Sequence, residues 1–352
     1  MRLTRNLSRF NKVLFFFNIV LTVVTFLAYV LPFLAPKIFP LLSVVTLVLP
    51  LFLVLNGLFF LYWLLQLKKQ IIISGLVLLI GITFVNKFYK FSSINEPITE
   101  NDFVVMSYNV RLLNLFKWID NESVPYRIEV FIKDKNPDIL CLQEFSKAAK
   151  IDLKLYPYKF VYTQGKKIKS AQAIFSKFPI INEGNLKFPK SDNNAIYADI
   201  KKGKDIIRVY NMHLESIKIS PDVNEISENI DEINQQKSEA LFKRISKAFT
   251  KQQQQAEIIK EHKTNCKYPI IICGDMNNSA FSYVYRSIRG SLKDAFEEAG
   301  AGFGKTYNFK QYPARIDYIF ADQSMKIKSF ESFSEFLNSD HFPIMTRLSI
   351  EE

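Results

Sequence analysis

Carboxylate, amide and imidazole side chains recur in this sequence where apolar runs begin or end. Asp275 and Asn277 directly follow one apolar run, and Asp340 and His341 directly precede another. His213 lies at the end of a third run, so two of the chain's three histidines occupy such positions. Carboxylates beside histidines are suited to acid–base chemistry and to binding divalent metals. The pattern therefore predicts a cluster of reactive groups at one edge of a buried sheet.

Three further polar residues occupy comparable positions. Asn109 ends the run VVMSYN, Glu144 ends DILCLQE, and Asp317 begins DYIF. Taken singly, such residues are usually turn residues, helix caps or solvated strand ends, and Asp317 beside Arg315 could form a surface ion pair. Their recurrence at strand ends throughout one chain favours a common functional site instead.

Metal-assisted hydrolysis of a phosphate ester accounts for these residue types. A phosphate ester repels an attacking hydroxide, and Mg²⁺ held by carboxylate oxygen offsets that negative charge. Glu144 suits the role of metal ligand, with support from Asn109. Asp275 could orient and deprotonate the attacking water, and Asn277 could hold that water or a phosphate oxygen.

The histidines suit the remaining tasks. His213 and His341 can donate hydrogen bonds to the phosphate in the transition state and to its leaving oxygen. A histidine in this role needs a carboxylate that fixes its tautomer, and Asp317 is the candidate partner of His341. The sequence has no CxxC, HExxH, Walker-type glycine loop or GxSxG, so zinc-protease, nucleotide-binding and α/β-hydrolase functions are not supported.

The positive charge of the chain is unevenly distributed. The net charge is +12, but the first 90 residues contain nine Lys/Arg and no Asp or Glu. The remainder carries 37 basic and 34 acidic residues. This near-neutral remainder does not indicate the basic groove that tight nucleic-acid binding requires.

The first 90 residues are predicted to be a membrane anchor with about three transmembrane helices. The apolar segments 13–35 and 41–67 both exceed the roughly 20 residues that a helix needs to cross a bilayer. The third segment, 70–89, is the weakest because its apolar core, 71–85, spans only about 22 Å as a helix. A re-entrant or interfacial segment is the alternative for this third one.

Basic residues in the loops predict the orientation of the anchor. With three crossings and a cytoplasmic N-terminus, six basic residues lie on the cytoplasmic side and three on the other. We therefore expect a multi-pass protein of the cytoplasmic (inner) membrane, with its C-terminal domain on the extracytoplasmic, periplasmic side. If the third segment does not cross, the domain lies in the cytoplasm.

The rest of the chain is predicted to be a short polar linker, 91–102, followed by one α/β domain, 103–352. Helical patterns cover 125–135 and 227–262, and the glutamine tract 252–255 is expected on a solvated helix face. Two packed sheets with outer helices account for the order of elements. The expected strands are 103–110, 138–143, 172–176, 196–200, 205–214, 269–273, 316–321 and 342–350.

The motifs resemble those of the endonuclease/exonuclease/phosphatase superfamily. The resemblance is carried by SYNV, LQE, NMHLES, GDMN, RIDYI and SDHFP, in this order, over roughly residues 103–350. This superfamily includes deoxyribonuclease-I-like nucleases, apurinic endonucleases, inositol-polyphosphate 5-phosphatases and neutral sphingomyelinases. The apolar N-terminal segments resemble those of bacterial membrane-anchored members.

The resemblance implies a fold and a metal. It implies a four-layer α/β/β/α sandwich, in which two packed mixed sheets are flanked by helices, with the site at one end of the sheets. It also implies dependence on Mg²⁺ or Mn²⁺, with Glu144 as the main ligand and with Asn109 and Asp340 in or near the metal shell. Water is implied to attack without a covalent intermediate.

The same resemblance implies catalytic roles. Asp275 and Asn277 handle the nucleophile, His341 pairs with Asp317, and His213 contacts the scissile phosphate. Departures from the family pattern leave the substrate open, and one is Ala171–Gln172, where many relatives have glycine. Arg111 stands where apurinic endonucleases commonly carry an acidic residue, and residues 216–250 form a long insertion.

Three functions fit these expectations. The first is a membrane-anchored nuclease or phosphodiesterase that acts on nucleic acid. The second is a phosphatase or phosphodiesterase for lipid headgroups or small phosphorylated molecules, and the third is a non-catalytic binding module that retains the fold. The expected partners are the lipid bilayer and a phosphate-ester substrate, and no protein partner is predicted.

Overall fold

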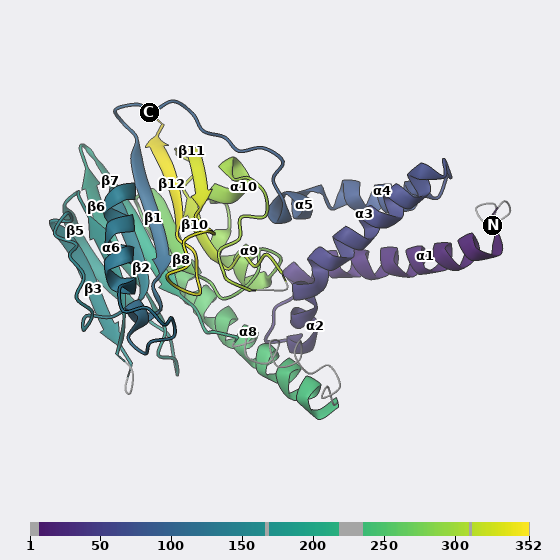
Figure 1. The fold of residues 1–352 in the computed structure, drawn as a ribbon, viewed down its shortest axis with the longest axis horizontal. Coiled ribbons are helices and arrows are strands. Elements are labelled where there is room, and N and C mark those ends of the chain that lie inside the picture. Colours follow the sequence, from purple (N-terminus) through teal and green to yellow (C-terminus); the bar gives the residue numbers. More distant parts are fainter. Residues whose placement is uncertain (1–6, 166–168, 218–234, 310–311, 352) are drawn as a thin grey trace.

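Two mixed six-stranded sheets pack face to face in a computed structural model that describes residues 7–165, 169–217, 235–309 and 312–351 (Figure 1). The first sheet contains, in spatial order, β11 (Met325–Ser332), β12 (Ile344–Ile350), β1 (Phe103–Asn109), β2 (Ile139–Phe145), β4 (Ser170–Ser176) and β3 (Tyr158–Gln164). The second contains β5 (Ile180–Lys187), β6 (Asn194–Lys202), β7 (Asp205–His213), β8 (Ile270–Asp275), β10 (Asp317–Ala321) and β9 (Lys293–Asp294). Strands β1 and β2 are parallel, as are β7 and β8, and the other neighbours are antiparallel.

Helices cover the outer face of each sheet. Helix α6 (Val124–Lys135) begins with a proline in its first turn and ends at Asn136, whose φ of 48° is left-handed. Its buried residues Val124, Ile128 and Ile132 recur every four positions and pack on the first sheet. Helices α8 (Gln235–Thr264) and α9 (Tyr283–Arg289) pack on the second sheet. The predicted four-layer α/β/β/α sandwich is confirmed.

The main core lies between the two sheets. Alternate residues of each central strand enter it, for example Val105 of β1, Cys141 of β2, Val209 of β7 and Ile319 of β10. All four side chains are fully buried. Because both sheets contribute side chains to this core, the strand ends of one sheet lie directly opposite those of the other.

The N-terminal segments form a separate helical bundle that projects from the sandwich (Figure 1). It contains α1 (Arg9–Val30), η2 (Leu31–Phe33), α2 (Pro40–Val44), η3 (Val45–Val48), α3 (Leu49–Leu65), α4 (Ile71–Ile80) and α5 (Ile82–Phe88). The stretches Arg9–Phe33 and Pro40–Leu65 are long and apolar enough to cross a membrane, and the pair α4 and α5 is bent by 70°. Crossing by this third segment stays a prediction.

Polar residues inside the apolar segments face one another across the bundle. The amide of Asn18 donates to Ser74 Oγ at 2.7 Å, and its carbonyl accepts from the indole of Trp63 at 3.0 Å. The amide of Asn56 donates to Thr25 Oγ1 at 2.9 Å. Such hydrogen bonds fix the register of helices where the surrounding side chains are apolar.

The expectation that the glutamine tract is solvated is wrong. Gln252, Gln253 and Gln255 are buried on α8, and Gln254 is exposed. The amide of Gln252 donates to the backbone carbonyl of Asn277 at 3.1 Å, and Gln253 Oε1 accepts from the backbone of Lys37 at 2.7 Å. The tract therefore connects α8 to both the predicted site and the N-terminal helical bundle. Residues 218–234, which belong to the insertion 216–250 and include the first residues of the predicted helix 227–262, lie outside the described residues.

Candidate active site

The register of the second sheet aligns three of the predicted residues. His213 of β7 is paired with Asp275 of β8, which is paired with Asp317 of β10. The three side chains therefore stand on neighbouring strands at one level of the sheet. Gly274 permits this close packing because its φ is +131° and an added Cβ would lie 2.0 Å from the carbonyl oxygen of Met212.

The first sheet contributes the opposing groups. Asn109 ends β1, Glu144 lies near the end of β2, and His341 precedes β12, which pairs with β1. Glu144 and Asn277 have left-handed φ angles of 48° and 50°. Such angles are unfavourable for residues other than glycine, and they concentrate at functional sites, where surrounding contacts enforce them.

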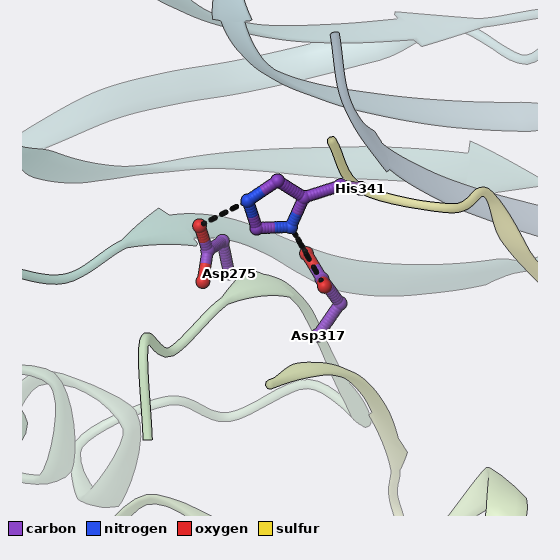
Figure 2. Close-up of side chains that lie close together, drawn as sticks. All are labelled: Asp275, Asp317 and His341. Carbon is purple, nitrogen blue, oxygen red and sulfur yellow. Dashed lines mark hydrogen bonds and ion pairs between the residues drawn. The ribbon is translucent and has the colours of Figure 1, made fainter. Parts of the chain in front are cut away.

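A chain of charged groups runs through the centre of the site (Figure 2). His341 Nδ1 lies 2.9 Å from Asp317 Oδ2, and His341 Nε2 lies 3.6 Å from Asp275 Oδ2. All three residues are buried. Burial disfavours the charged imidazole, but Asp317 and Asp275 outweigh it and raise the pKa of His341 to about 10. His341 is therefore protonated at neutral pH.

At Asp275, burial outweighs the neighbouring histidines, so the neutral form of the carboxyl group is favoured more than in water. Burial raises the pKa of this carboxyl group to about 6, and Asp317 adds to that effect, although His341 and His213 favour the ionised form. The backbone N–H of Asn277 donates to Asp275 Oδ1 at 2.8 Å, and the amide of Asn109 donates to Oδ2 at 3.0 Å. Asp275 is thus a buried carboxylate that two hydrogen bonds hold in place, and its pKa of about 6 lies near neutrality, as a general base requires.

His213 differs from His341 in its environment. Its Nε2 lies 3.5 Å from Asp275 and 3.7 Å from Glu144. Burial lowers the pKa of His213, and this exceeds the opposite effect of Asp275. The two histidines of one site therefore favour different protonation states, because Asp317 contacts only His341 among them.

The groups around Glu144 fit a hard cation. The Glu144 side chain is 30% exposed and lines the site cavity, with Oε1 at 3.5 Å from the Asn109 amide. Burial raises the pKa of this carboxyl group, although His341 favours its ionised form. Asp340 lies nearby and is paired with Arg111 at 3.4 Å. Oxygen donors of this kind bind Mg²⁺ or Mn²⁺.

A second grouping could also attract a metal. Asp275, Asp317 and His341 each offer a ligand atom within 4.8 Å of the others. His341 Nδ1 faces Asp317, so Nε2 is the atom that could bind a metal, and a metal there would have to displace the proton that Asp317 and Asp275 favour. A protonated imidazole has no lone pair for a metal. A proton and a metal would therefore compete at this grouping, whereas Glu144 with Asn109 forms a separate set of oxygen donors.

Asn277 has a structural contact as well as a position in the site. It lines the cavity, and its amide donates to the backbone carbonyl of Leu214 at 3.0 Å. Arg315, the alternative partner of Asp317, instead forms a buried pair with Asp294 at 2.8 Å. The proposed surface pair between Arg315 and Asp317 is therefore wrong.

Several supporting residues escaped the sequence analysis. The amide of Gln143 on β2 donates to Asn211 Oδ1 on β7 at 2.7 Å, which links the two sheets beneath the site. Thr306 Oγ1 accepts from the backbone N–H of Asp317 at 3.1 Å, and Ser339 Oγ donates to the carbonyl of Asn109 at 2.8 Å. Gln143 and Asn211 were detectable as polar residues inside apolar runs.

The site opens into a cavity of about 500 Å³. Six of the eight predicted residues line it, and Asn109 and Asp317 lie behind them, in contact with Asp275 and His341. The volume suits a small ligand or part of a larger one. The lining residues among the predicted set are Glu144, His213, Asp275, Asn277, Asp340 and His341.

A paired-sheet α/β sandwich with carboxylates, histidines and an amide at its central strand ends defines a class of phosphoester hydrolases. The sequence model described as the endonuclease/exonuclease/phosphatase family matches residues 106–341, so the chain belongs to this family. Its members are metal-dependent phosphoester hydrolases, and the protein is an enzyme of this type. A second model, described as a domain of unknown function (DUF8431), matches residues 11–88.

Solved structures show the same fold at low identity. An endonuclease/exonuclease/phosphatase from Bacteroides vulgatus has a TM-score of 0.53 and 20% identity over 72% of this chain and 100% of its own. ANGEL2, a 2′,3′-cyclic phosphatase, has a TM-score of 0.55 and 18% identity over 73% and 98%. The human Nocturnin catalytic domain has a TM-score of 0.53 and 16% identity over 74% and 97%. Comparison with curated proteins gives no match.

Proposed function

We propose that the protein is a membrane-anchored enzyme that hydrolyses a phosphate ester with Mg²⁺ or Mn²⁺ and an activated water. The main observation in support is a continuous series of polar contacts, which runs from Asp317 through His341 and Asp275 to Asn109 and Glu144. These groups come from both sheets, and Glu144, Asp275 and His341 line one cavity. A non-catalytic binding module has no need of a buried base and a protonated histidine in contact with each other.

Glu144, with Asn109 and Asp340 beside it, would hold the divalent cation. When bound, the cation offsets the negative charge of the phosphate and of the leaving oxygen. The Glu144 side chain suits this role because it is the acidic group of the set that combines exposure to the cavity with proximity to Asn109. Arg111 offsets part of the negative charge of Asp340 through their ion pair, and it can contact a substrate oxygen from the same side of the site.

The remaining residues handle protons. Asp275 accepts a proton from water as the water oxygen bonds to phosphorus, and Asn277 lies where it can hold that water. The P–O bond to the leaving group breaks, and the leaving oxygen takes a proton from His341. Asp317 keeps His341 protonated and oriented. His213 donates a hydrogen bond to a phosphoryl oxygen.

Anchoring in a bilayer is supported by the surface of the helical bundle. Phe16, Leu58 and Leu79 are 61%, 57% and 69% exposed, and such a broad apolar surface is unfavourable in water. The connection between α3 and α4, which carries Lys68 and Lys69, lies at the end of the bundle away from the sheets (Figure 1). With these lysines on the cytoplasmic side, the catalytic domain would be extracytoplasmic.

A metal-dependent assay tests the proposed chemistry. The full-length protein in detergent should hydrolyse bis(4-nitrophenyl) phosphate with Mg²⁺ or Mn²⁺ and lose this activity in EDTA. Asp275→Asn should lower kcat by about 100-fold or more, because a positioned base contributes at least this much. Asp322→Asn changes an aspartate that caps a turn at Ser324, away from the cavity, and should leave kcat near that of the unmodified protein. Equal activity of the two variants would refute the proposed site.

A further inference from the structure

We propose that the substrate is a membrane lipid that carries a phosphate ester, and that the anchor forms one wall of its binding cavity. The inference rests on the proposed function, since it assigns a substrate class to the same site. The phosphate group would reach Asp275 and Glu144, while the adjoining part of the apolar chain would lie against residues of the membrane-spanning segments.

The cavity has two chemically different sides. Its polar side includes six of the predicted catalytic and metal-binding residues. Its other side includes Leu47 and Val48 at the start of the second span and Phe88 at the end of α5. Apolar residues of the catalytic domain, including Phe281 and Phe309, complete this side. One cavity therefore joins the hydrolytic groups to segments predicted to lie in lipid.

Contacts hold this apolar wall against the catalytic domain. The ring of Phe84 stacks on Phe281 with centroids 6.2 Å apart, and Phe88 stacks on Tyr312 at 6.1 Å. Arg315 Nη2 donates to the backbone carbonyl of Lys87 at 3.1 Å. The anchor is thus part of the cavity rather than a tether that leaves the domain free.

Arg315 also connects the wall to the catalytic strand. It is buried, pairs with Asp294, and stands two positions before Asp317 on the approach to β10. On the opposite side, α8 contacts the start of the second span, where Ser246 Oγ donates to the carbonyl of Pro40 at 2.6 Å. The cavity wall and the catalytic residues are therefore fixed relative to each other from two directions.

The lining suits a lipid better than a nucleic acid. Among the described residues that line the cavity, the lysine and arginine are Lys87 and Arg315, beside the catalytic histidines His213 and His341. Arg315 is paired with Asp294, and the Lys87 ammonium lies over the ring of Tyr285, 5.0 Å from its centroid. A polynucleotide would need several cations for its successive phosphates. An amphiphile needs one polar end and one apolar end, which is the arrangement present.

Access from the bilayer follows from the position of the wall. Val48 is 41% exposed, and its neighbours along the second span, Leu42 and Leu51, are 45% and 53% exposed. Exposed apolar surface thus continues from the cavity along the anchor. A lipid whose phosphate enters the cavity can keep its chain in apolar surroundings throughout, because it leaves the bilayer only to meet an apolar protein wall.

A chain-length series tests the inference. The substrates are alkyl 4-nitrophenyl phosphate diesters with ethyl, octyl or hexadecyl chains, assayed with full-length protein in lipid bicelles and Mg²⁺. The hexadecyl ester should give a kcat/KM at least tenfold above that of the ethyl ester. Because long esters concentrate in bicelles whatever the cavity contains, the decisive quantity is the hexadecyl-to-ethyl ratio compared among variants.

Two valine variants provide that comparison. Val48→Gln makes the wall of the cavity polar and should lower the hexadecyl-to-ethyl ratio at least threefold. Val54→Gln makes the same change at a residue of α3 that is 45% exposed and does not line the cavity. The ratio in this control should equal that of the unmodified protein. Equal ratios in the two variants, or no chain-length dependence in any of them, would overturn the inference.

The outcomes separate the two proposals. Hydrolysis of the ethyl ester that depends on Asp275 but is indifferent to chain length would retain the phosphoesterase and reject the lipid substrate. Nicking of plasmid DNA at a higher kcat/KM than that for the hexadecyl ester would also reject it, in favour of a nuclease. No hydrolysis of any ester with either metal would reject both proposals.

Discussion

The Nδ1 atom of His341 lies 2.9 Å from Oδ2 of Asp317, and the two residues come from different sheets of the sandwich. Asp317 begins β10 of the second sheet, whereas His341 precedes β12 of the first. The contact therefore exists only when the two sheets are packed. Loss of this contact would therefore indicate both that the packing of the two sheets has changed and that His341 is no longer held in its position for catalysis.

Removal of the Asp317 charge should neutralise His341 near neutral pH. In Asp317→Asn the main group that stabilises the imidazolium is lost, so the pKa of His341 should fall from about 10. Hydrolysis at pH 7.5 should decline by about tenfold or more, because the proton donor is depleted. NMR titration of His341 measures the pKa directly, and an unchanged pKa in Asp317→Asn would contradict the assignment of this pair.

The same pair should give stability that depends on alkaline pH. A histidine whose pKa is raised by folding stabilises the fold fully below its unfolded pKa, about 6.5, and this contribution is lost as pH rises through the folded value. The loss should therefore extend from about pH 6.5 to about pH 10. Melting temperatures measured in EDTA should fall over this range more steeply for the unmodified protein than for Asp317→Asn. Parallel curves would argue against the pair.

Metal binding should depend on Glu144. Mn²⁺ should raise the melting temperature of the unmodified protein, because a ligand that binds only the folded state stabilises it. In Glu144→Gln this rise should be much smaller, and activity should require at least tenfold more metal. Glu129→Gln is the matched control, since Glu129 pairs with Lys133 on α6. An equal response of both variants to Mn²⁺ would exclude Glu144 as the ligand.

The buried pair of Arg315 and Asp294 should contribute strongly to stability. Asp294→Asn leaves a buried guanidinium without its counter-charge, and such changes cost about 3–5 kcal/mol. Asp134→Asn removes a carboxylate that is 71% exposed and should cost about 0–1 kcal/mol. Denaturant unfolding measures the free energy of unfolding of both variants. Similar losses would show that the buried pair stabilises the fold no more than an exposed carboxylate does.

The pair of Arg315 and Asp294 should lose its stabilising effect in acid, whereas the pair of His341 and Asp317 should lose its effect in alkali. Burial disfavours the ionised form of Asp294, but Arg315 outweighs it, so the pKa of Asp294 is lowered. The resulting stability is present above the unfolded pKa of about 3.9 and is lost as pH falls below it toward the folded value. Unfolding followed between pH 2 and pH 5 should show a shallower loss in Asp294→Asn than in the unmodified protein.

The side of the membrane can be tested with C-terminal fusions in a bacterial host. An alkaline-phosphatase fusion should be active, because this reporter folds outside the cytoplasm, and a GFP fusion should be dark. The expectation follows from the basic loop between α3 and α4 and from three crossings. Bright GFP with inactive phosphatase would indicate that the bent pair α4 and α5 does not cross.

The sequence by itself determined the class of fold and the residues that meet at the site. The central strands are apolar on both faces, so they can be recognised in the sequence as short apolar runs. The four strands absent from the sequence-based expectation, β3, β5, β9 and β11, are the edge strands of the two sheets. Edge strands are short or partly polar because one side faces solvent, so their pattern is weak.

Only the tertiary structure decided how these residues act together. The pairing of His213, Asp275 and Asp317 depends on strand register, which local sequence does not specify. The separation of α4 from α5 occurs at Gly81, where an added Cβ would lie 2.0 Å from the hydroxyl of Tyr29, a residue distant in sequence. The burial of the glutamine tract and the contribution of the N-terminal helical bundle to the cavity likewise depend on packing between distant segments. Such contacts are set by the energy of the whole fold and leave no periodic signal in the chain.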